Sequence, residues 1–175
     1  MALIKKVRNI SPQIGRDCFL AETAVIIGDV KIGNNCSIWY NTVLRGDVNS
    51  INIGNNVNIQ DGAVLHTLFK KSTIQIGNKV SIAHNVTLHG AEIHDFALIG
   101  IGAIILDHAV IGKHAIIAAN SLVKAGTEVE PYSVYAGIPA KKIKDVDPEQ
   151  THEMNERIAN NYVKYAGWYK EADSW

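Results

Sequence analysis

The chain has 175 residues, of which 47% are hydrophobic, and its 17 basic and 17 acidic side chains cancel. A chain of this length and apolar content buries a core without disulfides or metal, so we expect a single domain. The balanced charge argues against a nucleic-acid partner or a polybasic membrane patch. There is no apolar run of about 18 residues and no cleavable leader, so the sequence predicts a cytoplasmic protein without a membrane partner.

An aliphatic residue recurs at every sixth position over most of the chain. The longest series begins at Ile93 and closes on Tyr135, and two shorter series lie between it and the first one. The members are Ile14, Leu20, Ile26, Ile32, Ile38 and Leu44; Ile53, Ile59 and Leu65; Ile76, Ile82 and Leu88; and Ile93, Ile99, Ile105, Ile111, Ile117, Val123, Val129 and Tyr135.

A second column of small or β-branched residues occupies the fifth position of these hexads, and we expect both columns to point inward. It contains Cys18, Ala24, Val30, Cys36, Thr42, Val48, Val57, Ala63, Val80, Val86, Ala97, Ala103, Ala109, Ala115, Ser121, Thr127 and Ser133. A hexad repeat with two inward columns is typical of a parallel β-helix, in which three short strands and three turns make one triangular coil of about 18 residues. Residues 1–140 are therefore predicted to form an all-β solenoid of about seven coils.

Three irregularities interrupt the repeat. Three extra residues fall within residues 44–53, five fall within residues 65–76, and the hexad at residues 88–93 is one residue short. We expect the two insertions to leave corners of the coils as loops.

Cys18 and Cys36 lie one coil apart in the same inward column. We interpret them as stacked core thiols, because buried cysteine behaves as a small hydrophobic residue. A disulfide or a metal role is the alternative.

Residues 141–175 depart from the hexad pattern and are predicted to form a linker and a C-terminal helix packed on the β-helix. Pro148 suits the first turn of this helix, with Asp147 as its cap. Apolar residues then recur at intervals of three and four, at Met154, Ile158, Tyr162, Tyr165 and Tyr169. This stripe indicates that the helix covers the coils and helps to hold a subunit interface.

Three histidines occupy related positions on the coils. His66 and His89 share one slot in successive coils, and Arg45 holds the same slot one coil earlier, so these side chains should lie on one edge of the triangle. His84 belongs to a different edge, next to Asp61. A cyclic assembly brings different edges of neighbouring subunits together, and zinc at catalytic sites takes three protein ligands. We therefore predict a metal site between subunits.

The remaining histidines, His94, His108, His114 and His152, are expected to be exposed to solvent. Asp47, Gln60 and Asp61 supply carboxylate and amide groups that could orient the histidine ligands. Hydrogen bonds and ion pairs between subunits are the alternative role for these residues, and the two roles are compatible.

Several motifs resemble those of the gamma-class carbonic anhydrases and their carbonic-anhydrase-like relatives. They are Arg45-Gly46-Asp47, Asn58-Ile59-Gln60-Asp61-Gly62, His66, and His84-Asn85-Val86-Thr87-Leu88-His89-Gly90. The resemblance extends over the whole chain. It implies a left-handed β-helix, a homotrimer, and one zinc ion per interface, replaced by iron or cobalt in some members.

The resemblance also implies roles for individual residues. His66 and His89 are similar to the two ligands from one subunit, and His84 to the ligand from its neighbour. Gln60 resembles the residue that hydrogen-bonds the metal-bound hydroxide, and Asn58 a polar neighbour of the substrate pocket. Arg45, Asp47 and Asp61 resemble an ion-pair network between subunits, and Tyr162 is similar in placement to a tail tyrosine near the site.

The chain departs from the active archetype at two places. Val48 stands where the archetype carries a glutamate just after the Arg-x-Asp motif, and residues 67–72 contain no carboxylate where the archetype has an acidic loop. Those glutamates move protons in the archetype, so we expect export of a proton by that route to be slow in this chain. Buffer or a histidine could carry the proton instead.

The leading hypothesis is reversible hydration of carbon dioxide to bicarbonate, because a metal held by three neutral imidazoles lowers the pKa of its water to about 7. The alternatives are a metal-dependent acyl-CoA thioesterase, a hexapeptide acyltransferase and a weakly active metal-binding trimer. Acyl transfer usually needs one histidine base and no trihistidine set.

Overall fold

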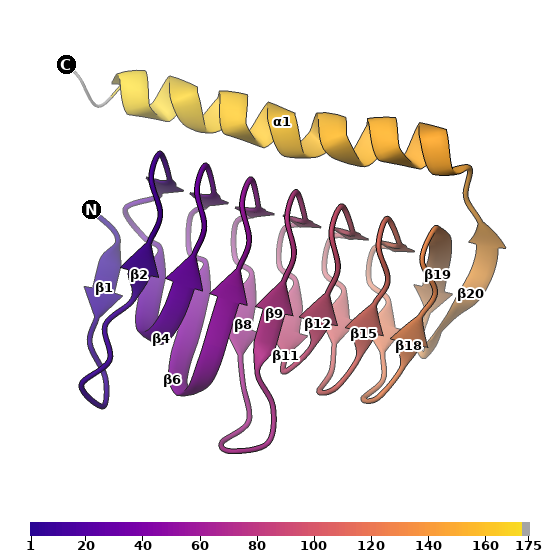
Figure 1. Ribbon diagram of the computed structural model, residues 1–175, viewed down its shortest axis with the longest axis horizontal. Coiled ribbons are helices and arrows are strands. Elements are labelled where there is room, and N and C mark those ends of the chain that lie inside the picture. The colour runs from indigo at the N-terminus through magenta and orange to yellow at the C-terminus, as the bar shows by residue number, and fades with distance from the viewer. Residues whose placement is uncertain (173–175) are drawn as a thin grey trace.

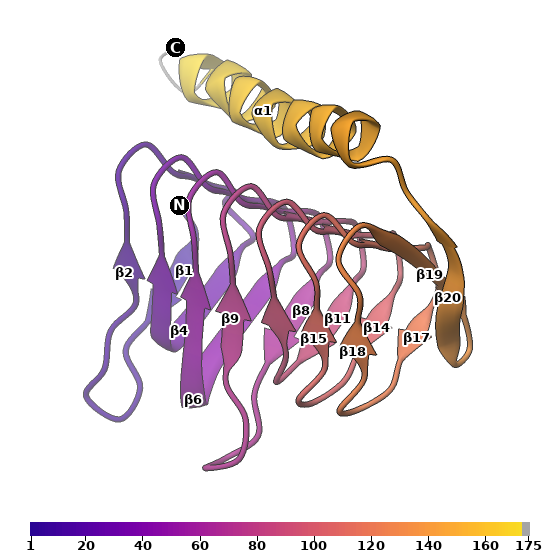
Figure 2. The same cartoon turned by 45° about the vertical axis from the view of Figure 1, so that its right-hand side comes forward.

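The protein is a prism of stacked coils with one long helix lying along it. The computed structural model describes residues 1–172, with side chains through Lys170. Three walls of parallel strands surround a continuous core, and the helix runs along the stack (Figures 1 and 2). The parallel β-solenoid predicted from the hexads is therefore confirmed.

Two of the walls belong to one sheet, because two long strands bend around the corner between them. These strands are β4 (Val25–Ile32) and β6 (Val43–Ile53). The first wall, here the β8 wall, contains the first halves of β4 and β6 with β1 (Leu3–Lys5), β8 (Val64–His66), β11 (Thr87–His89), β14 (Ile104–Ile105) and β17 (Leu122–Val123). The second, the β9 wall, contains their second halves with β2 (Gln13–Ile14), β9 (Ile74–Ile76), β12 (Glu92–Ile93), β15 (Val110–Ile111) and β18 (Glu128–Val129).

The third wall is a separate sheet that faces the helix. This β10 wall contains β3 (Phe19–Leu20), β5 (Ser37–Ile38), β7 (Asn58–Ile59), β10 (Ser81–Ile82), β13 (Leu98–Ile99), β16 (Ile116–Ile117) and β19 (Ser133–Gly137). Strand β20 (Ala140–Asp145) pairs with β19 in the antiparallel sense. Most of the segment assigned to a linker from sequence is thus a strand, whose residues are largely exposed.

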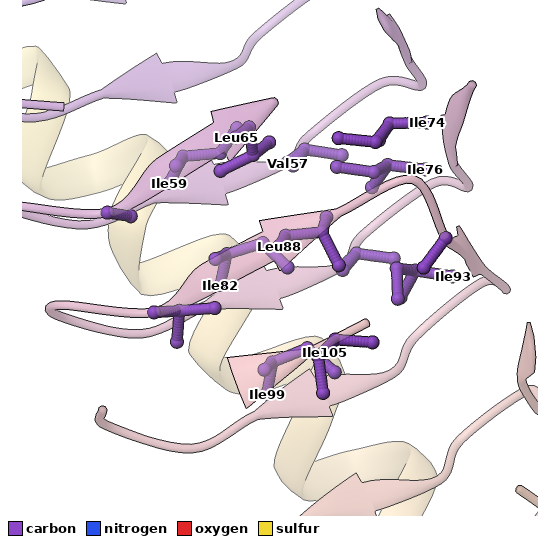
Figure 3. Close-up of a cluster of buried hydrophobic side chains, with 14 of the residues drawn as sticks. Val57, Ile59, Leu65, Ile74, Ile76, Ile82, Leu88, Ile93, Ile99 and Ile105 are labelled. Carbon is purple, nitrogen blue, oxygen red and sulfur yellow. The ribbon is translucent and has the colours of Figure 1, made fainter. Parts of the chain in front are cut away.

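The core is built from the two inward columns. Leu44, Leu65, Leu88, Ile105 and Val123 pair in register from coil to coil, and each is fully buried. Figure 3 shows how such side chains from the three walls meet on the axis. Each buried side chain of this size contributes about 1.5–3 kcal/mol through removal of apolar surface from water. The hexad pattern therefore defines the register as well as the fold.

The insertion within residues 44–53 changes one predicted inward position. Val30 pairs with Ile51, which is fully buried, and Val48 lies outside the core in a half-buried position. The prediction that Val48 points inward is therefore wrong, because the extra residues displace the register of β6 at the corner. The longer insertion forms the loop that extends between β8 and β9 (Figure 1).

The helix α1 (Pro148–Ala172) begins as the sequence predicts. The Asp147 carboxylate caps it by accepting a hydrogen bond of 2.9 Å from the Gln150 amide. The most buried positions on α1 are small or polar, at Thr151, Asn155, Ala159 and Ala166. The predicted apolar stripe lies beside this line and is partly exposed, because only short side chains allow the helix backbone to approach the wall closely.

Cys18 and Cys36 are free thiols, as the sequence predicts. Their Sγ atoms donate to the carbonyl oxygens of Gly33 and Gly54 at 3.1 Å. Cys36 belongs to the core and Cys18 packs against it.

Within residues 1–172, no helix combines the length and apolarity that crossing a membrane requires.

Candidate metal centre

His66 and His89 lie side by side at the edge where the β8 wall meets the β9 wall. They are paired in register, their ring centroids are 5.3 Å apart, and Arg45 pairs with His66 from the preceding coil. About a fifth of the His66 side chain and somewhat more of the His89 side chain is exposed. The predicted column of Arg45, His66 and His89 is confirmed, so two imidazoles face solvent together.

Asp47 links Arg45 to His66. Its Oδ2 accepts a hydrogen bond from Arg45 Nη1 at 2.7 Å, and its Oδ1 lies 3.2 Å from His66 Nε2. Burial tends to raise the pKa of Asp47, but the hydrogen bond and charge of Arg45 outweigh it and hold the pKa below its usual value. Burial and the Arg45 charge together lower the pKa of His66. His66 therefore favours the neutral form, which is the form that binds metals.

His89 has a carboxylate partner that sequence reasoning missed. Its Nδ1 lies 2.8 Å from Asp107 Oδ2, and Asp107 Oδ1 accepts a hydrogen bond from Ser72 Oγ at 2.6 Å. Burial tends to raise the pKa of Asp107, but the hydrogen bonds from Ser72 and His89 keep it low. Asp107 follows His89 by 18 residues, one more than the 17 residues that separate the paired Leu88 and Ile105 in this shortened coil. That spacing is the signal that could have identified it.

His84 occupies the opposite edge of the β8 wall, where this wall meets the β10 wall. It follows β10 in sequence, and its Nδ1 lies 3.0 Å from Asp61 Oδ2, with both side chains about two-fifths exposed. The prediction that His84 lies next to Asp61 is confirmed. In the part of the chain that the structure describes, no three His, Cys, Asp or Glu side chains converge on one ion position. A site that uses all three histidines therefore needs a second chain.

Gln60 and Asn58 form a buried chain of amides beside Asp61. Gln60 Nε2 donates to Asn58 Oδ1 at 2.9 Å, and Asn58 Nδ2 donates to Ser81 Oγ at 2.7 Å. Both amide side chains are at least 95% buried. Since its nitrogen is committed to Asn58, Gln60 presents Oε1 as the atom that can accept a hydrogen bond from a bound water.

Tyr162 reaches the same corner from helix α1. Its ring packs edge-on against Trp39 and Tyr165, with a centroid separation of 5.6 Å in both cases. Burial raises the pKa of Tyr162, and the negative charge of Asp61 adds to this effect. The helix thus brings Tyr162 toward the Asp61 corner, and its catalytic role remains a prediction.

The other histidines follow the sequence expectation with one exception. His94, His108 and His152 are exposed, but His114 is only 2% exposed. Its ring stacks between Phe96 and Tyr132, at centroid distances of 4.6 and 4.8 Å, and His152 from α1 covers it. The prediction of exposure is wrong for His114, because the helix and the neighbouring coils enclose this corner position.

Comparisons with known proteins agree with this fold and with the motifs. The family model described as bacterial transferase hexapeptide (six repeats) matches residues 11–46 and 90–125. A solved Bacillus cereus structure, named as a candidate acetyltransferase, is 40% identical with a TM-score of 0.92, and the match covers 98% of each chain. The fold is accordingly the left-handed β-helix of hexapeptide-repeat proteins.

Two relatives show which family of hexapeptide-repeat proteins the chain belongs to. A carbonic anhydrase from Geobacillus kaustophilus is 44% identical over 96% of this chain and 91% of its own length. Gamma carbonic anhydrase 2, mitochondrial, from Arabidopsis thaliana is 40% identical over 93% of this chain, which spans 60% of that relative. The chain belongs to the gamma carbonic anhydrase family.

Proposed function

We propose that His66 and His89 of one subunit and His84 of a neighbour bind one divalent metal, zinc or alternatively iron or cobalt, in a homotrimer that reversibly hydrates carbon dioxide. The observation that carries the proposal is the pairing of His84 with Asp61 and of His89 with Asp107. A carboxylate that accepts a hydrogen bond from Nδ1–H leaves the Nε2 lone pair available to a metal, as at His89. Asp61 lies at the same nitrogen of His84, whereas Asp47 lies at Nε2 of His66 and would have to release that nitrogen when a metal binds. The donor set therefore fits the metal that the family resemblance implies.

The outward face of the β8 wall supports the trimer. Val43, Val64, Thr87, Ile104 and Leu122 form one column on this face, and Val64 and Ile104 are each 40% exposed. Ile101, which is 52% exposed, lies in the turn before β14, at the His84 edge of this wall. This face lies between the His84 edge and the His66–His89 edge. A ring of subunits packed through these faces brings the His84 edge of each chain against the other edge of its neighbour.

The residues around the metal position have separable tasks. A divalent metal held by three imidazoles supplies hydroxide at neutral pH, because it lowers the pKa of bound water. Gln60 Oε1 would accept a hydrogen bond from the water or hydroxide that attacks carbon dioxide and would so fix its orientation. Asn58 holds the Gln60 amide in place, and Asp47 with Arg45 provides a charged pair at the edge of the site.

Metal analysis coupled to stopped-flow carbon dioxide hydration tests the proposal, with protein prepared anaerobically so that ferrous iron is retained. We expect about one metal per chain and hydration activity that is lost in His89→Ala. His94→Ala is the matched control, because His94 also contacts a carboxylate but is exposed away from the histidine pair. Metal-free protein that cannot be loaded with zinc, iron or cobalt would contradict the proposal.

Acyl transfer is a second candidate, because the Bacillus cereus structure named above is described as a candidate acetyltransferase. That chemistry uses a histidine base and requires no metal. Acyl transfer from acetyl-CoA that continues at full rate after metal removal would favour it, whereas metal-dependent hydrolysis of acyl-CoA would favour the thioesterase. A trimer that binds metal but catalyses neither reaction would be the weakly active alternative. A cytoplasmic location stays a prediction from the sequence.

A further inference from the structure

We propose that Asp107, held by Ser72, is a positioning residue that fixes the tautomer and orientation of His89 for metal binding. This inference deepens the proposed metal site and rests on it. Neither residue belongs to the motifs that carry the resemblance to the gamma carbonic anhydrases.

Hydrogen bonds form a continuous chain from the loop between β8 and β9 to His89. Asp107 uses both carboxylate oxygens, since Oδ2 lies 2.8 Å from His89 Nδ1 and Oδ1 accepts from Ser72 Oγ at 2.6 Å. Ser72 is 5% exposed, and its Oγ also accepts a hydrogen bond of 3.0 Å from the Leu68 amide. Asn49 Nδ2 donates to the Ser72 carbonyl oxygen at 2.8 Å. Both insertions in the repeat therefore contribute to holding the Asp107 carboxylate.

Gly90 provides the space in which this chain of contacts forms. A Cβ atom on Gly90 would lie 2.1 Å from Ser72 Oγ and 2.2 Å from Asp107 Oδ1, so a larger residue cannot occupy the position while the contact persists. Its φ of +62° also favours glycine. The shortened hexad after His89 thus places a residue without a side chain where serine and aspartate meet.

The contact has a chemical consequence for His89. The Asp107 carboxylate accepts a hydrogen bond from Nδ1–H, so the neutral ring keeps its proton on Nδ1 and its lone pair on Nε2. Carboxylates in this position also limit ring rotation and increase ligand basicity. His66 differs, because Asp47 approaches its Nε2 rather than its Nδ1. Asp107 is therefore assigned to His89 alone.

Two measurements on Asp107→Asn test the assignment in the full-length protein. Nitrogen-15 spectra of histidine-labelled, metal-free protein report the tautomer of His89, which we expect to be the Nδ1–H form in the wild type and a mixture in the variant. Competition with a chelator reports zinc affinity, which should fall about 10- to 100-fold. Ser72→Ala, which removes the hydroxyl from Oδ1, should cause a smaller loss of affinity in the same direction.

Glu92→Gln is the matched control, since Glu92 Oε1 lies 2.8 Å from His94 Nε2 on an exposed surface. It should leave zinc affinity and the His89 signals unchanged. An unaltered His89 tautomer and unaltered zinc affinity in Asp107→Asn would overturn the inference. Loss of the metal-free trimer or of its thermal stability would also overturn it, by making Asp107 a structural residue. Failure of the wild type to bind any metal would instead refute the proposed function. The tautomer measurement would still test whether Asp107 orients His89, because it uses metal-free protein.

Discussion

The coils of residues 44–90 and those of residues 91–135 share one core but differ on their outer surfaces. Residues 93–135 keep the six-residue period without a break, whereas the two insertions and the shortened hexad lie between residues 44 and 93. The interrupted coils hold His66, His84 and His89, and the insertions supply Asp47 and Ser72. In this solenoid the regular hexads supply the side chains of the core, and most residues of the candidate site come from the coils in which the six-residue period is interrupted.

Replacing Gly90 by alanine should have the largest effect on the stability of the interrupted coils. The new Cβ would overlap Ser72 and Asp107, and the left-handed backbone adds strain, so we expect a loss of about 2 to 5 kcal/mol in the free energy of unfolding. Denaturant unfolding of the metal-free protein measures this loss. Gly126→Ala in the regular coils is the control, because its φ is +69° and no atom lies within 4 Å; it should cost only about 1 to 2 kcal/mol. Equal losses would mean that Gly90 supplies conformational freedom and not space.

In the regular coils, His114 should affect stability and not metal binding. Burial, followed by the charges of His152 and Lys113, lowers the pKa of His114 from 6.5 to about 4, against an opposing effect of Asp95. The unfolded chain therefore binds more protons between these values, so the His114 contribution to stability is fully present above about pH 6.5 and is lost toward pH 4. The loss should reach up to about 3 kcal/mol.

His114→Phe checks this pH dependence. Phenylalanine can stack between Phe96 and Tyr132, and it removes the buried Nδ1 that has no hydrogen-bond partner among the described residues. The variant should show a flatter stability profile between pH 6.5 and 4, and His108→Gln at an exposed position should not. A profile unchanged in His114→Phe would show that other groups dominate acid unfolding.

Gln60→Ala should separate catalysis from metal binding in the interrupted coils. The side chain is held by Asn58 and contacts none of the three histidines by a hydrogen bond, so metal content should remain close to the wild-type value. Hydration activity should fall about 10- to 100-fold. Gln75→Ala, at an exposed position of the β9 wall, is the control. Loss of metal and trimer together in Gln60→Ala would instead make Gln60 a structural residue.

The smallest expected effect concerns proton export. Because Val48 and residues 67–72 provide no carboxylate, the turnover rate should rise with the concentration of an imidazole-type buffer. The ratio kcat/KM, which reports the carbon dioxide step, should stay nearly constant. Val48→Glu should reduce this dependence. A high turnover rate that does not respond to buffer would show that another group, such as Tyr162 or a histidine, moves the proton.

The sequence predicts the regular part of this molecule better than the interrupted part. The two inward columns specify the walls, the register and the core, because a hexad leaves little choice of which side chains face inward. Val48 is mispredicted because it lies in an insertion, where the six-residue count no longer decides which side chain faces inward, and Ile51 takes the inward position. Asp107 is missed because the short hexad after His89 displaces the coil count, and His114 because helix α1 covers it from outside the repeat.

Mixed trimers test most directly whether the metal site is shared between subunits. Coexpression of His84→Ala chains with His66→Ala chains in equal amounts should restore about one site in four, because each mixed ring contains one interface with both halves intact. Coexpression of His66→Ala with His89→Ala should restore none, since both residues belong to the same edge. Zinc content should exceed that of either single variant only in the first mixture, and equal, negligible zinc in both mixtures would contradict a site shared between subunits.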